Sequence, residues 1–285
     1  MKTLRQRAPL YILLMLVAII LFTFYALARE NPNTLTVAFL DVGQGDAIFI
    51  ESPTGTQIVI DGGPGKSILR ELPKVMPIYD RSIDAIMITN PDADHSAGFI
   101  DVLYRYDVGL EIEPGTEKHT ITYQTLEGVL ESKGVKRILA RRGMKLDLGG
   151  GAHLEILYPD LDVANYSPND GSIVAKLIYG KTSVMLMGDA TERVERHLLA
   201  IASTSVYKTD LLKLGHHGSK TSSSQSWLEA VSPSAAIISV GLDNRYGLPS
   251  PVVTERLASG SIPYLQTSEE GTIVYESDGS TFIRK

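Results

Sequence analysis

The chain has 285 residues, a formal charge of −6 and a hydrophobic fraction of 44%, values typical of a globular protein with a substantial core. The negative charge excludes a generally basic nucleic-acid binder, so any contact with DNA depends on a local basic patch. The absence of cysteine excludes disulfides, thiolate metal sites and a thiol nucleophile, which leaves nitrogen and oxygen as metal ligands.

The N-terminal segment differs from the rest of the chain. Three positive charges precede an uncharged, mainly apolar run from Pro9 to Ala28. Such a run is long enough to cross a bilayer, and the preceding charges keep the N-terminus in the cytoplasm. Residues 26–28 also fit a signal-peptide cleavage site, so an uncleaved anchor and a cleaved signal both stay open. We expect a transmembrane or signal segment over 1–30 and an extracytoplasmic domain over 31–285, tethered to the cell membrane or secreted.

The remainder alternates short apolar runs with Gly, Asp and Asn, a pattern that indicates short strands separated by turns. Strands are predicted over 35–40, 47–50, 57–60, 85–88, 135–139, 153–158, 172–179, 183–187, 211–214, 235–240, 262–266, 271–275 and 281–284. Helices are predicted over 67–75, 96–106, 121–133, 191–202, 224–231 and 251–259. Strands lead each half and helices follow, so we expect an α+β fold with two sheets packed between outer helices.

The strongest chemical signal follows the apolar run Ala85–Ile88, which ends in the sequence Asn90-Pro91-Asp92-Ala93-Asp94-His95. Buried carboxylates and imidazoles are costly unless they pair with each other or bind a metal. Asp94 and His95 are adjacent, so they converge on one ion only where the chain turns from strand to helix. A polar loop with helix-capping aspartates is the alternative interpretation.

Two later apolar runs end in the same way. Asp189 follows one of them, and His216 and His217 follow the other. Asp189 is either a metal ligand or a cap of the helix that begins just after it. We expect one of the two histidines to bind metal while its neighbour contacts substrate or orients the ligands. The flanking glycines allow close approach of the backbone there.

The segment from Ser219 to Ser224 is rich in hydroxyl groups and contains Lys220. It either binds phosphate at the N-terminus of the next helix or forms a capped, flexible loop. Lys220 with Lys213 and Arg245 is the local basic patch through which we expect any contact with DNA, and such contact should weaken with salt.

These motifs taken together resemble the metallo-β-lactamase fold superfamily. More narrowly, they resemble the hydrolase domain at the end of ComEC-type channel proteins, which take up DNA in natural competence. The resemblance covers the chain from Leu35 onward, and its motifs stand at 39–47, 60–63, 90–95, 188–190, 213–219 and 240–247. It implies an αββα sandwich of two similar halves with metal at one edge of the sheets. The multi-span channel is not in this sequence, so we expect a free-standing relative.

The resemblance also implies a divalent metal, zinc or manganese. One firm position is implied on Asp94, His95, Asp189 and one of His216 or His217. A second position, weak or empty, rests on Asn90, Asp92 and Asp189. Asn90 stands where the superfamily usually has a histidine, and an amide oxygen suits manganese better than zinc.

The implied activity is that of a metal-dependent hydrolase, a phosphodiesterase or nuclease acting on DNA, in which metal-bound hydroxide attacks phosphorus. We expect Asp92 or Asp94 to orient the water. Lys220, Arg245 or a loop hydroxyl is expected to stabilise the developing charge. Expected substrate contacts come from Asp41, Gln44, Asp46, Asp61, Asn169, Ser172, Ser219, Asn244, Arg245 and Tyr246. The alternatives are a metal-poor, non-catalytic module that binds DNA or protein, and hydrolysis of a β-lactam or other small ester.

Overall fold

The structure is a computed structural model that describes residues 2–29 and 33–285. The chain divides into two compact units, Met1–Asn33 and Thr34–Lys285. The domain boundary expected between residues 30 and 31 falls outside the described residues.

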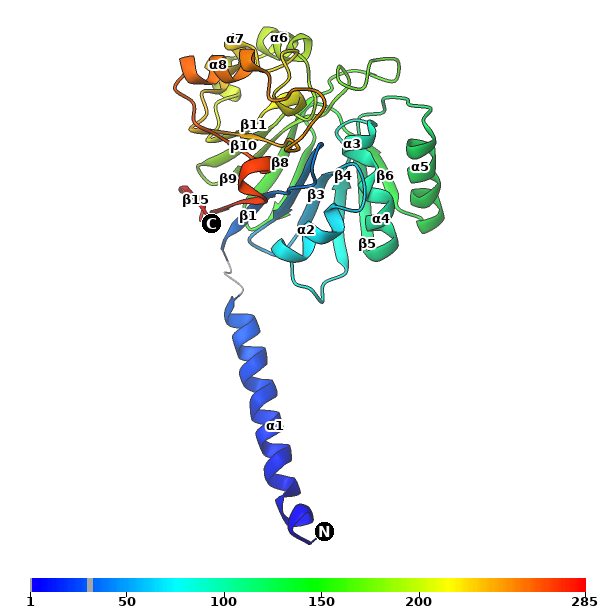
Figure 1. The fold of residues 1–285 in the computed structure, drawn as a ribbon, viewed down its shortest axis with the longest axis vertical. Helices are drawn as coiled ribbons and strands as arrows, with labels where there is room; N and C mark the ends of the chain where they lie inside the picture. The colour runs from blue at the N-terminus through cyan, green and yellow to red at the C-terminus, as the bar shows by residue number, and fades with distance from the viewer. Residues whose placement is uncertain (1, 30–32) are drawn as a thin grey trace. The chain divides into compact units, whose positions relative to one another are not determined.

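The N-terminal unit is one helix, α1 (Lys2–Arg29), drawn in blue in Figure 1. Its side chains from Leu10 to Phe22 are exposed. Among the described residues, no helix combines the length and the hydropathy of a membrane span. The structure therefore gives no support to the transmembrane helix expected over 1–30, and the side chains of residues 24–29 lie outside those described.

The second unit is an αββα sandwich of two sheets, which confirms the expected α+β fold (Figure 1). Within residues 33–285, the larger sheet has eight strands in the order β15-β14-β1-β2-β3-β4-β5-β6, and the smaller has seven in the order β13-β12-β11-β10-β9-β8-β7. The larger sheet comprises β1 (Leu35–Phe39), β2 (Ala47–Glu51), β3 (Gln57–Gly62), β4 (Ser82–Met87), β5 (Asp107–Glu113), β6 (Lys136–Leu139), β14 (Ile273–Ser277) and β15 (Phe282–Arg284). The smaller comprises β7 (Lys145–Gly149), β8 (Ala152–Tyr158), β9 (Val174–Tyr179), β10 (Thr182–Leu186), β11 (Leu211–Lys213), β12 (Ala235–Ile238) and β13 (Tyr264–Gln266).

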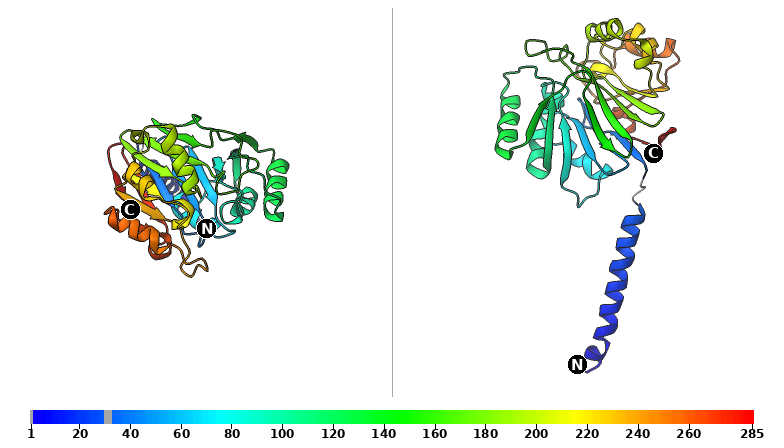
Figure 2. Two further views of the ribbon diagram at one scale, coloured as in Figure 1. Left: turned by 90° about the horizontal axis from the view of Figure 1, so that it is seen from above. Right: turned by 180° about the vertical axis from the view of Figure 1, so that it is seen from behind.

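Helices cover the outer face of each sheet, as Figure 2 shows from above and from behind. Those of the first half are α2 (Ile68–Val75), α3 (Ala93–Ser96), α4 (Gly98–Arg105) and α5 (Ile121–Lys133). Those of the second half are α6 (Glu192–Ile201), α7 (Gln225–Val231), α8 (Pro251–Ser259) and α9 (Thr267–Glu270). The single helix expected over 96–106 is two helices, and the first of them begins earlier, at Ala93.

Side-chain alternation along the strands explains the layers. In β3, Ile58 and Ile60 belong to the core between the sheets, while Val59 belongs to the cluster under the helices of the first half. A strand buried on both faces is apolar almost throughout, which is why β3 reads as a continuous hydrophobic run. Trp227 of α7 and Leu212 of β11 belong to the matching cluster of the second half.

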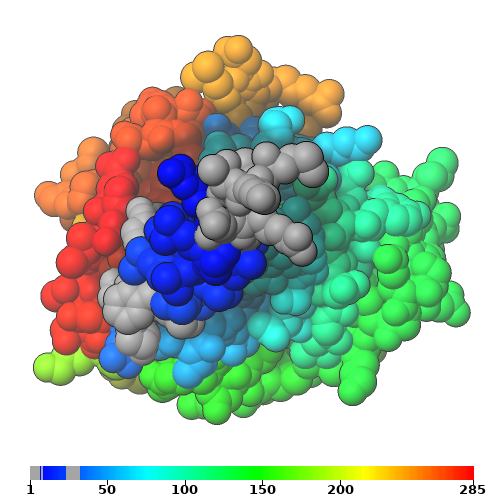
Figure 3. Space-filling model, turned by 90° about the horizontal axis from the view of Figure 1, so that it is seen from below, coloured from blue at the N-terminus to red at the C-terminus, as the bar shows by residue number. Residues whose placement is uncertain are grey.

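Each half begins with antiparallel strands and ends with parallel ones: β1–β3 then β3–β6, and β7–β10 then β10–β13. The chain then returns to the larger sheet, where β14 pairs antiparallel with β1 and places Leu35 opposite Ser277. In the space-filling view of Figure 3, the red C-terminal residues and the green residues that include α5 lie on opposite sides of one face.

The parallel strands position the chemistry. β3 carries Asp61 near its carboxyl end, and the residues that follow β4, β10 and β11 include His95, Asp189 and His217. Ligands in α/β sheets bind beyond the carboxyl ends of the strands, and here the two sheets contribute such ends to one edge of the sandwich.

Candidate metal centre

His95 is fully buried in α3, just after the loop that leaves β4. Its Nδ1 lies 2.8 Å from Oδ2 of Asp61, and the same carboxylate accepts hydrogen bonds from the backbone N–H (2.8 Å) and the hydroxyl (2.7 Å) of Thr89. Because an ionised carboxylate only accepts, Nδ1 carries the proton and Nε2 is left to bind a metal. No described residue gives Nε2 a hydrogen bond, and Nε2 lies 3.1 Å from Oδ2 of Asp189.

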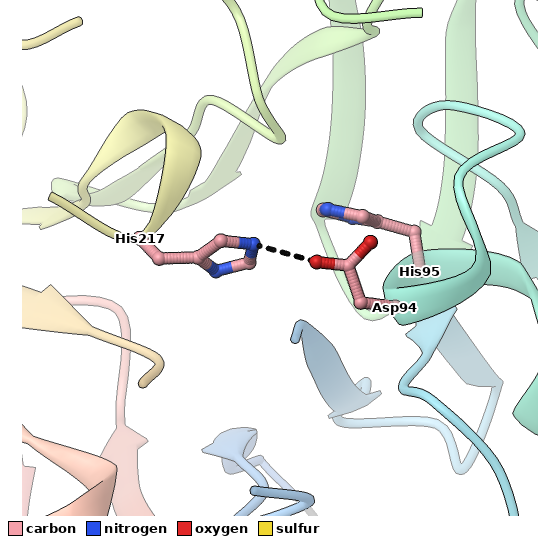
Figure 4. A group of neighbouring side chains, drawn as sticks. All are labelled: Asp94, His95 and His217. Carbon is pink, nitrogen blue, oxygen red and sulfur yellow. Dashed lines mark ion pairs between the residues drawn. The ribbon is translucent and has the colours of Figure 1, made fainter. Parts of the chain in front are cut away.

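His217 is arranged in the same way from the other half of the fold. Its Nδ1 lies 3.0 Å from the carbonyl oxygen of Ser239 and 3.1 Å from Oδ1 of Asp46, and both atoms are acceptors. Its Nε2 therefore points toward the carboxylates, at 3.4 Å from Oδ2 of Asp94 and 3.6 Å from Oδ1 of Asp189. Figure 4 shows Asp94 and His95 at the start of α3, with His217 approaching from the facing loop.

The backbone that presents these groups is strained. His216 and His217 have φ angles of 49° and 53°, in the left-handed region that non-glycine residues rarely adopt. A Cβ on Gly215 would lie 2.9 Å from the carbonyl oxygen of Ala190, so the chain needs glycine at that position. Strain of this kind persists where the surrounding structure enforces it, and it is typical of functional sites.

The donor set fits one divalent ion. Ligand atoms at about 2.1 Å from a tetrahedral ion are about 3.4 Å apart, and the contacts among Nε2 of His95, Nε2 of His217 and the two carboxylates measure 3.1, 3.4 and 3.6 Å. Both Nε2 atoms and Oδ1 of Asp189 are buried without a hydrogen-bond partner among the described residues, as expected of atoms meant for an ion. Asp94, His95 and His217 form a group whose ligand atoms all lie within 4.8 Å of one another, and Asp189 lies within 3.6 Å of both histidines, so these four residues are the candidate ligands.

The electrostatics of the site are consistent with a place for a cation. Burial alone would raise the pKa of Asp189, but His95 and His217 hold that pKa far below its usual range. Burial alone would lower the pKa of each histidine, yet the carboxylates raise that of His217 to about 9 and that of His95 well above its ordinary value. A metal that binds these imidazoles therefore has to compete with protons.

His216 occupies a different place from its neighbour. Its Nε2 lies 3.9 Å from Oδ2 of Asp189, its Nδ1 lies 2.9 Å from Oγ1 of Thr221, and its side chain is 27% exposed. Nε2 is also 3.5 Å from Nδ2 of Asn169. Burial lowers the pKa of His216, which favours a neutral ring. The distances favour His217 as the ligand and leave His216 on the open side of the site.

The second expected metal position is built differently. Asn90 is fully buried, and its Oδ1 accepts the backbone N–H of Asp92 at 2.9 Å. The carboxylate of Asp92 is paired with the ammonium of Lys118, a residue that sequence reasoning did not identify. The amide oxygen of Asn90 and Oδ1 of Asp92 are therefore engaged within the protein, and neither Asn90 nor Asp92 joins a group of described residues that fits a metal.

Three residues expected to contact substrate lie instead behind the ligands. Asp46 and Asp61 are each 1% exposed and orient His217 and His95, and Ser172 is fully buried. The hydroxyl of Ser172 accepts the backbone N–H of Asp189 at 2.9 Å. Groups closed off in this way do not fit a role in binding substrate, and we assign them to orienting the ligands.

Other expected contacts hold loops at the rim. The side chain of Gln44 accepts the backbone N–H of Gly241, and Asn244 bridges Gly241 to Leu248. Asp41 accepts the N–H of Gly43 at 3.3 Å in a local turn.

The expected basic patch is only partly present at the surface. Arg245 and Tyr246 are both exposed, with the guanidinium 5.1 Å from the centre of the ring, and Lys220 is exposed as well. Lys213 is fully buried, with its ammonium 2.6 Å from Oδ2 of Asp46, so it takes no part in a surface that contacts DNA.

The serine-rich loop is ordered by a buried carboxylate. Glu195 of α6 accepts the backbone N–H groups of Ser223 (2.5 Å) and Ser224 (2.9 Å). Ser219 and Ser222 are buried, and the hydroxyl of Ser222 donates to the carbonyl of Gly215. Ser224 caps α7, because its hydroxyl accepts the backbone N–H of Trp227 at 3.3 Å, so the capped loop is the alternative that the structure favours. The backbone N–H groups of Ser223 and Ser224 are engaged by Glu195 and are not free to bind phosphate.

The fold and the donor set together define a metallohydrolase-like scaffold, and comparison with known families agrees. Residues 40–241 match the model of the metallo-beta-lactamase superfamily, and the chain belongs to that superfamily. It is similar to ComE operon protein 3 of Bacillus subtilis, with 29% identity over 91% of this chain and 34% of that protein. It is also similar to Recombination protein 2 of Haemophilus influenzae, with 31% identity over 85% of this chain and 29% of that protein. Competence protein ComA of Neisseria gonorrhoeae is similar as well, with 26% identity over 89% of this chain and 34% of that protein.

The chain spans about a third of the length of these curated relatives. Solved structures of similar fold include CmlA, a diiron β-hydroxylase from Streptomyces venezuelae, with a TM-score of 0.53, 13% identity and coverage of 88% of this chain and 54% of that one. Another is a metal-dependent hydrolase of the β-lactamase superfamily, with a TM-score of 0.51, 11% identity and coverage of 81% and 95%. At these identities the likeness shows the fold alone.

Proposed function

We propose that this protein is a metal-dependent phosphodiesterase that cuts single-stranded DNA with one manganese or zinc ion. The convergence of two Nε2 atoms, each with its Nδ1 fixed by acceptors, on the carboxylates of Asp94 and Asp189 carries the proposal. Two imidazole nitrogens and two carboxylate oxygens suit both manganese and zinc. The names of the relatives, which refer to competence and recombination, support DNA as the substrate class.

A bound ion lowers the pKa of water and so supplies hydroxide near neutral pH. The protein's own residues then orient the reactants. The carboxylate of Asp94 is 35% exposed, against 4% for Asp189, so Asp94 is the ligand that reaches solvent and can align a water. His216 lies on the open side with a neutral ring held by Thr221, a placement suited to hydrogen bonding with the leaving oxygen.

The test is cleavage of a labelled single-stranded oligonucleotide by the purified full-length protein, with Mn²⁺ or Zn²⁺ added and bound metal quantified. We expect metal-dependent cutting that disappears in His217→Ala and Asp189→Ala, since each removes a ligand. His153→Ala is the matched control, because the strand register places His153 beside Ile178 and Ile178 beside Ser183, at the start of β10 and not at the end that Asp189 follows.

A folded protein that binds no metal and cuts nothing would contradict this proposal. That result would favour the alternative of a binding module in which the fold is retained without chemistry. Cleavage of a β-lactam in preference to DNA would instead move the substrate class to small molecules.

We also propose, from the sequence alone, that the N-terminal segment holds the protein at the cell membrane with the hydrolase unit outside the cytoplasm. The uncharged run from Pro9 to Ala28 and the preceding positive charges support this. Fractionation of cells that express the full chain, compared with a chain that begins at Asn33, tests it. Equal distribution of the two proteins between membrane and soluble fractions would contradict the anchor.

A further inference from the structure

A lysine pairs with one of the residues expected to hold a second metal. The ammonium of Lys118 pairs with Oδ1 of Asp92, and the two side chains are 26% and 28% exposed, so the pair is partly open to solvent. The side-chain amide oxygen of Asn90, two residues before Asp92, accepts a hydrogen bond from the backbone N–H of Asp92.

The loop that carries Lys118 is fixed by two contacts with the opposite half of the fold. The backbone N–H of Glu117 donates to the carbonyl of Ala164 at 3.1 Å. Thr116 is buried against Gly171, where an added Cβ would come within 2.3 Å of the threonine hydroxyl. These contacts flank Lys118 on its N-terminal side, so its position is built into the fold.

We propose that the ammonium of Lys118 takes the place of a second metal ion at Asp92, so that the protein holds a single divalent ion. A single positive charge neutralises Asp92, and it repels a dication that approaches the same carboxylate. The inference deepens the proposed function, on which its catalytic meaning rests, because the ammonium supplies a positive charge in place of the one that a second ion would bring.

The experiment counts bound Mn²⁺ in full-length proteins by elemental analysis and by loss of the free-ion signal in electron paramagnetic resonance. Asn90→His restores a nitrogen ligand, and Asn90→His/Lys118→Gln also removes the charge. We expect one further equivalent of Mn²⁺ in the double variant compared with Asn90→His. Asn90→His/Lys133→Gln is the matched control, because Lys133 is an exposed lysine at the end of α5, and it should bind as Asn90→His does.

Asn90 is fully buried, so its replacement can prevent folding. In that case the test uses Lys118→Glu in the otherwise native protein, compared with wild type and with Lys133→Glu. Lys118→Glu replaces the ammonium with a carboxylate that can bind a metal, so it should bind one more equivalent of Mn²⁺ than wild type. The inference is overturned if the number of bound Mn²⁺ equivalents is the same with and without Lys118. The comparison is Asn90→His against Asn90→His/Lys118→Gln, or wild type against Lys118→Glu, whichever pair folds. A wild-type protein that binds no metal contradicts the proposed function instead, because the inference depends only on the difference within a pair.

Discussion

At the scale of single residues, the site depends on which nitrogen of each imidazole is free. Asp61 and Asp46 lie beside the Nδ1–H groups of His95 and His217 as acceptors, and this leaves both Nε2 atoms directed at the carboxylates of Asp94 and Asp189. A histidine without such a partner can present either nitrogen. The carboxylates behind the ligands therefore contribute to the geometry of the centre without touching an ion.

We predict that Asp61→Asn lowers the affinity for Mn²⁺ about 10- to 100-fold while the fold persists. The substitution weakens the acceptor that fixes Nδ1 of His95. Isothermal titration calorimetry on the full chain measures the change, with Asp101→Asn on the outer helix α4 as the control. An affinity equal to that of wild type would show that Asp61 does not orient the ligand.

A second buried carboxylate lies outside the metal centre. Glu111 on β5 is 1% exposed, and its pKa is raised to about 7 because burial outweighs the attraction of Arg137, while Glu113 and Glu127 add repulsion. Its folded pKa exceeds the unfolded value of 4.5, so the folded state binds this proton more tightly. The contribution of Glu111 to stability is therefore lost as pH rises from about 4.5 to 7.

Glu111→Gln should accordingly be more stable than wild type at pH 8, by about 1–3 kcal/mol, and no more stable than wild type at pH 4.5. Urea unfolding at the two pH values measures the difference in the free energy of unfolding. Glu131→Gln, an exposed position on the neighbouring helix α5, is the control. A gain that does not change with pH would assign the effect to packing and not to ionisation.

Three of the four candidate ligands, Asp94, His95 and Asp189, could be predicted from the sequence because they stand in polar motifs that come shortly after apolar runs, and strand ends meet at one edge. Lys118 could not be predicted as part of this region, because its contact with Asp92 depends on the hydrogen bond between the backbones of Glu117 and Ala164. The choice of His217 over His216 was also beyond the sequence, because two adjacent left-handed residues decide it.

At the scale of elements, most strands and helices follow from apolar runs and turn residues, and the strands missed are those that carry charge. β5 contains Glu111 and Glu113, and such charged residues in a sequence are typical of a loop. In the structure, both carboxylates pair with Arg137 of the neighbouring strand β6. β7 has exposed Lys145 and Asp147 and is an edge strand. Periodicity cannot identify strands whose polar groups are satisfied by a neighbour.

The loop after β11 gives a prediction at this scale. Glu195→Gln removes one of the two acceptors that hold the N–H groups of Ser223 and Ser224, and it should destabilise the protein by about 1–3 kcal/mol. Hydrogen exchange at these two amides should accelerate more than at the amides within α7, which begins at Gln225. Glu229→Gln, at an exposed position that accepts only from the side chain of Gln225, is the control. Unchanged exchange would mean that the loop holds its conformation without Glu195.

At the scale of the whole molecule, the metal centre joins the two halves of the sandwich. Asp94 and His95 come from the first half, and Asp189 and His217 come from the second. An ion that binds the folded state alone stabilises it by about 2.7 kcal/mol at a concentration 100 times its Kd. We therefore predict that chelation lowers the midpoint of thermal unfolding by about 5–10 °C, as scanning calorimetry would measure. His217→Ala should show no such shift, and a shift of wild-type size in that variant would contradict the assigned ligand.

The return of the chain to its first sheet has a consequence for synthesis. β1 follows the N-terminal segment, yet one of its two flanking partners, β14, comes after all of the strands from β2 to β13. Until β14 is made, one edge of β1 offers unpaired backbone groups, which any extended chain can join. A nascent or truncated protein that ends at β13 is therefore an open template for strand exchange. β14 closes this edge, so nearly every strand of the fold has to be made before the first one is protected.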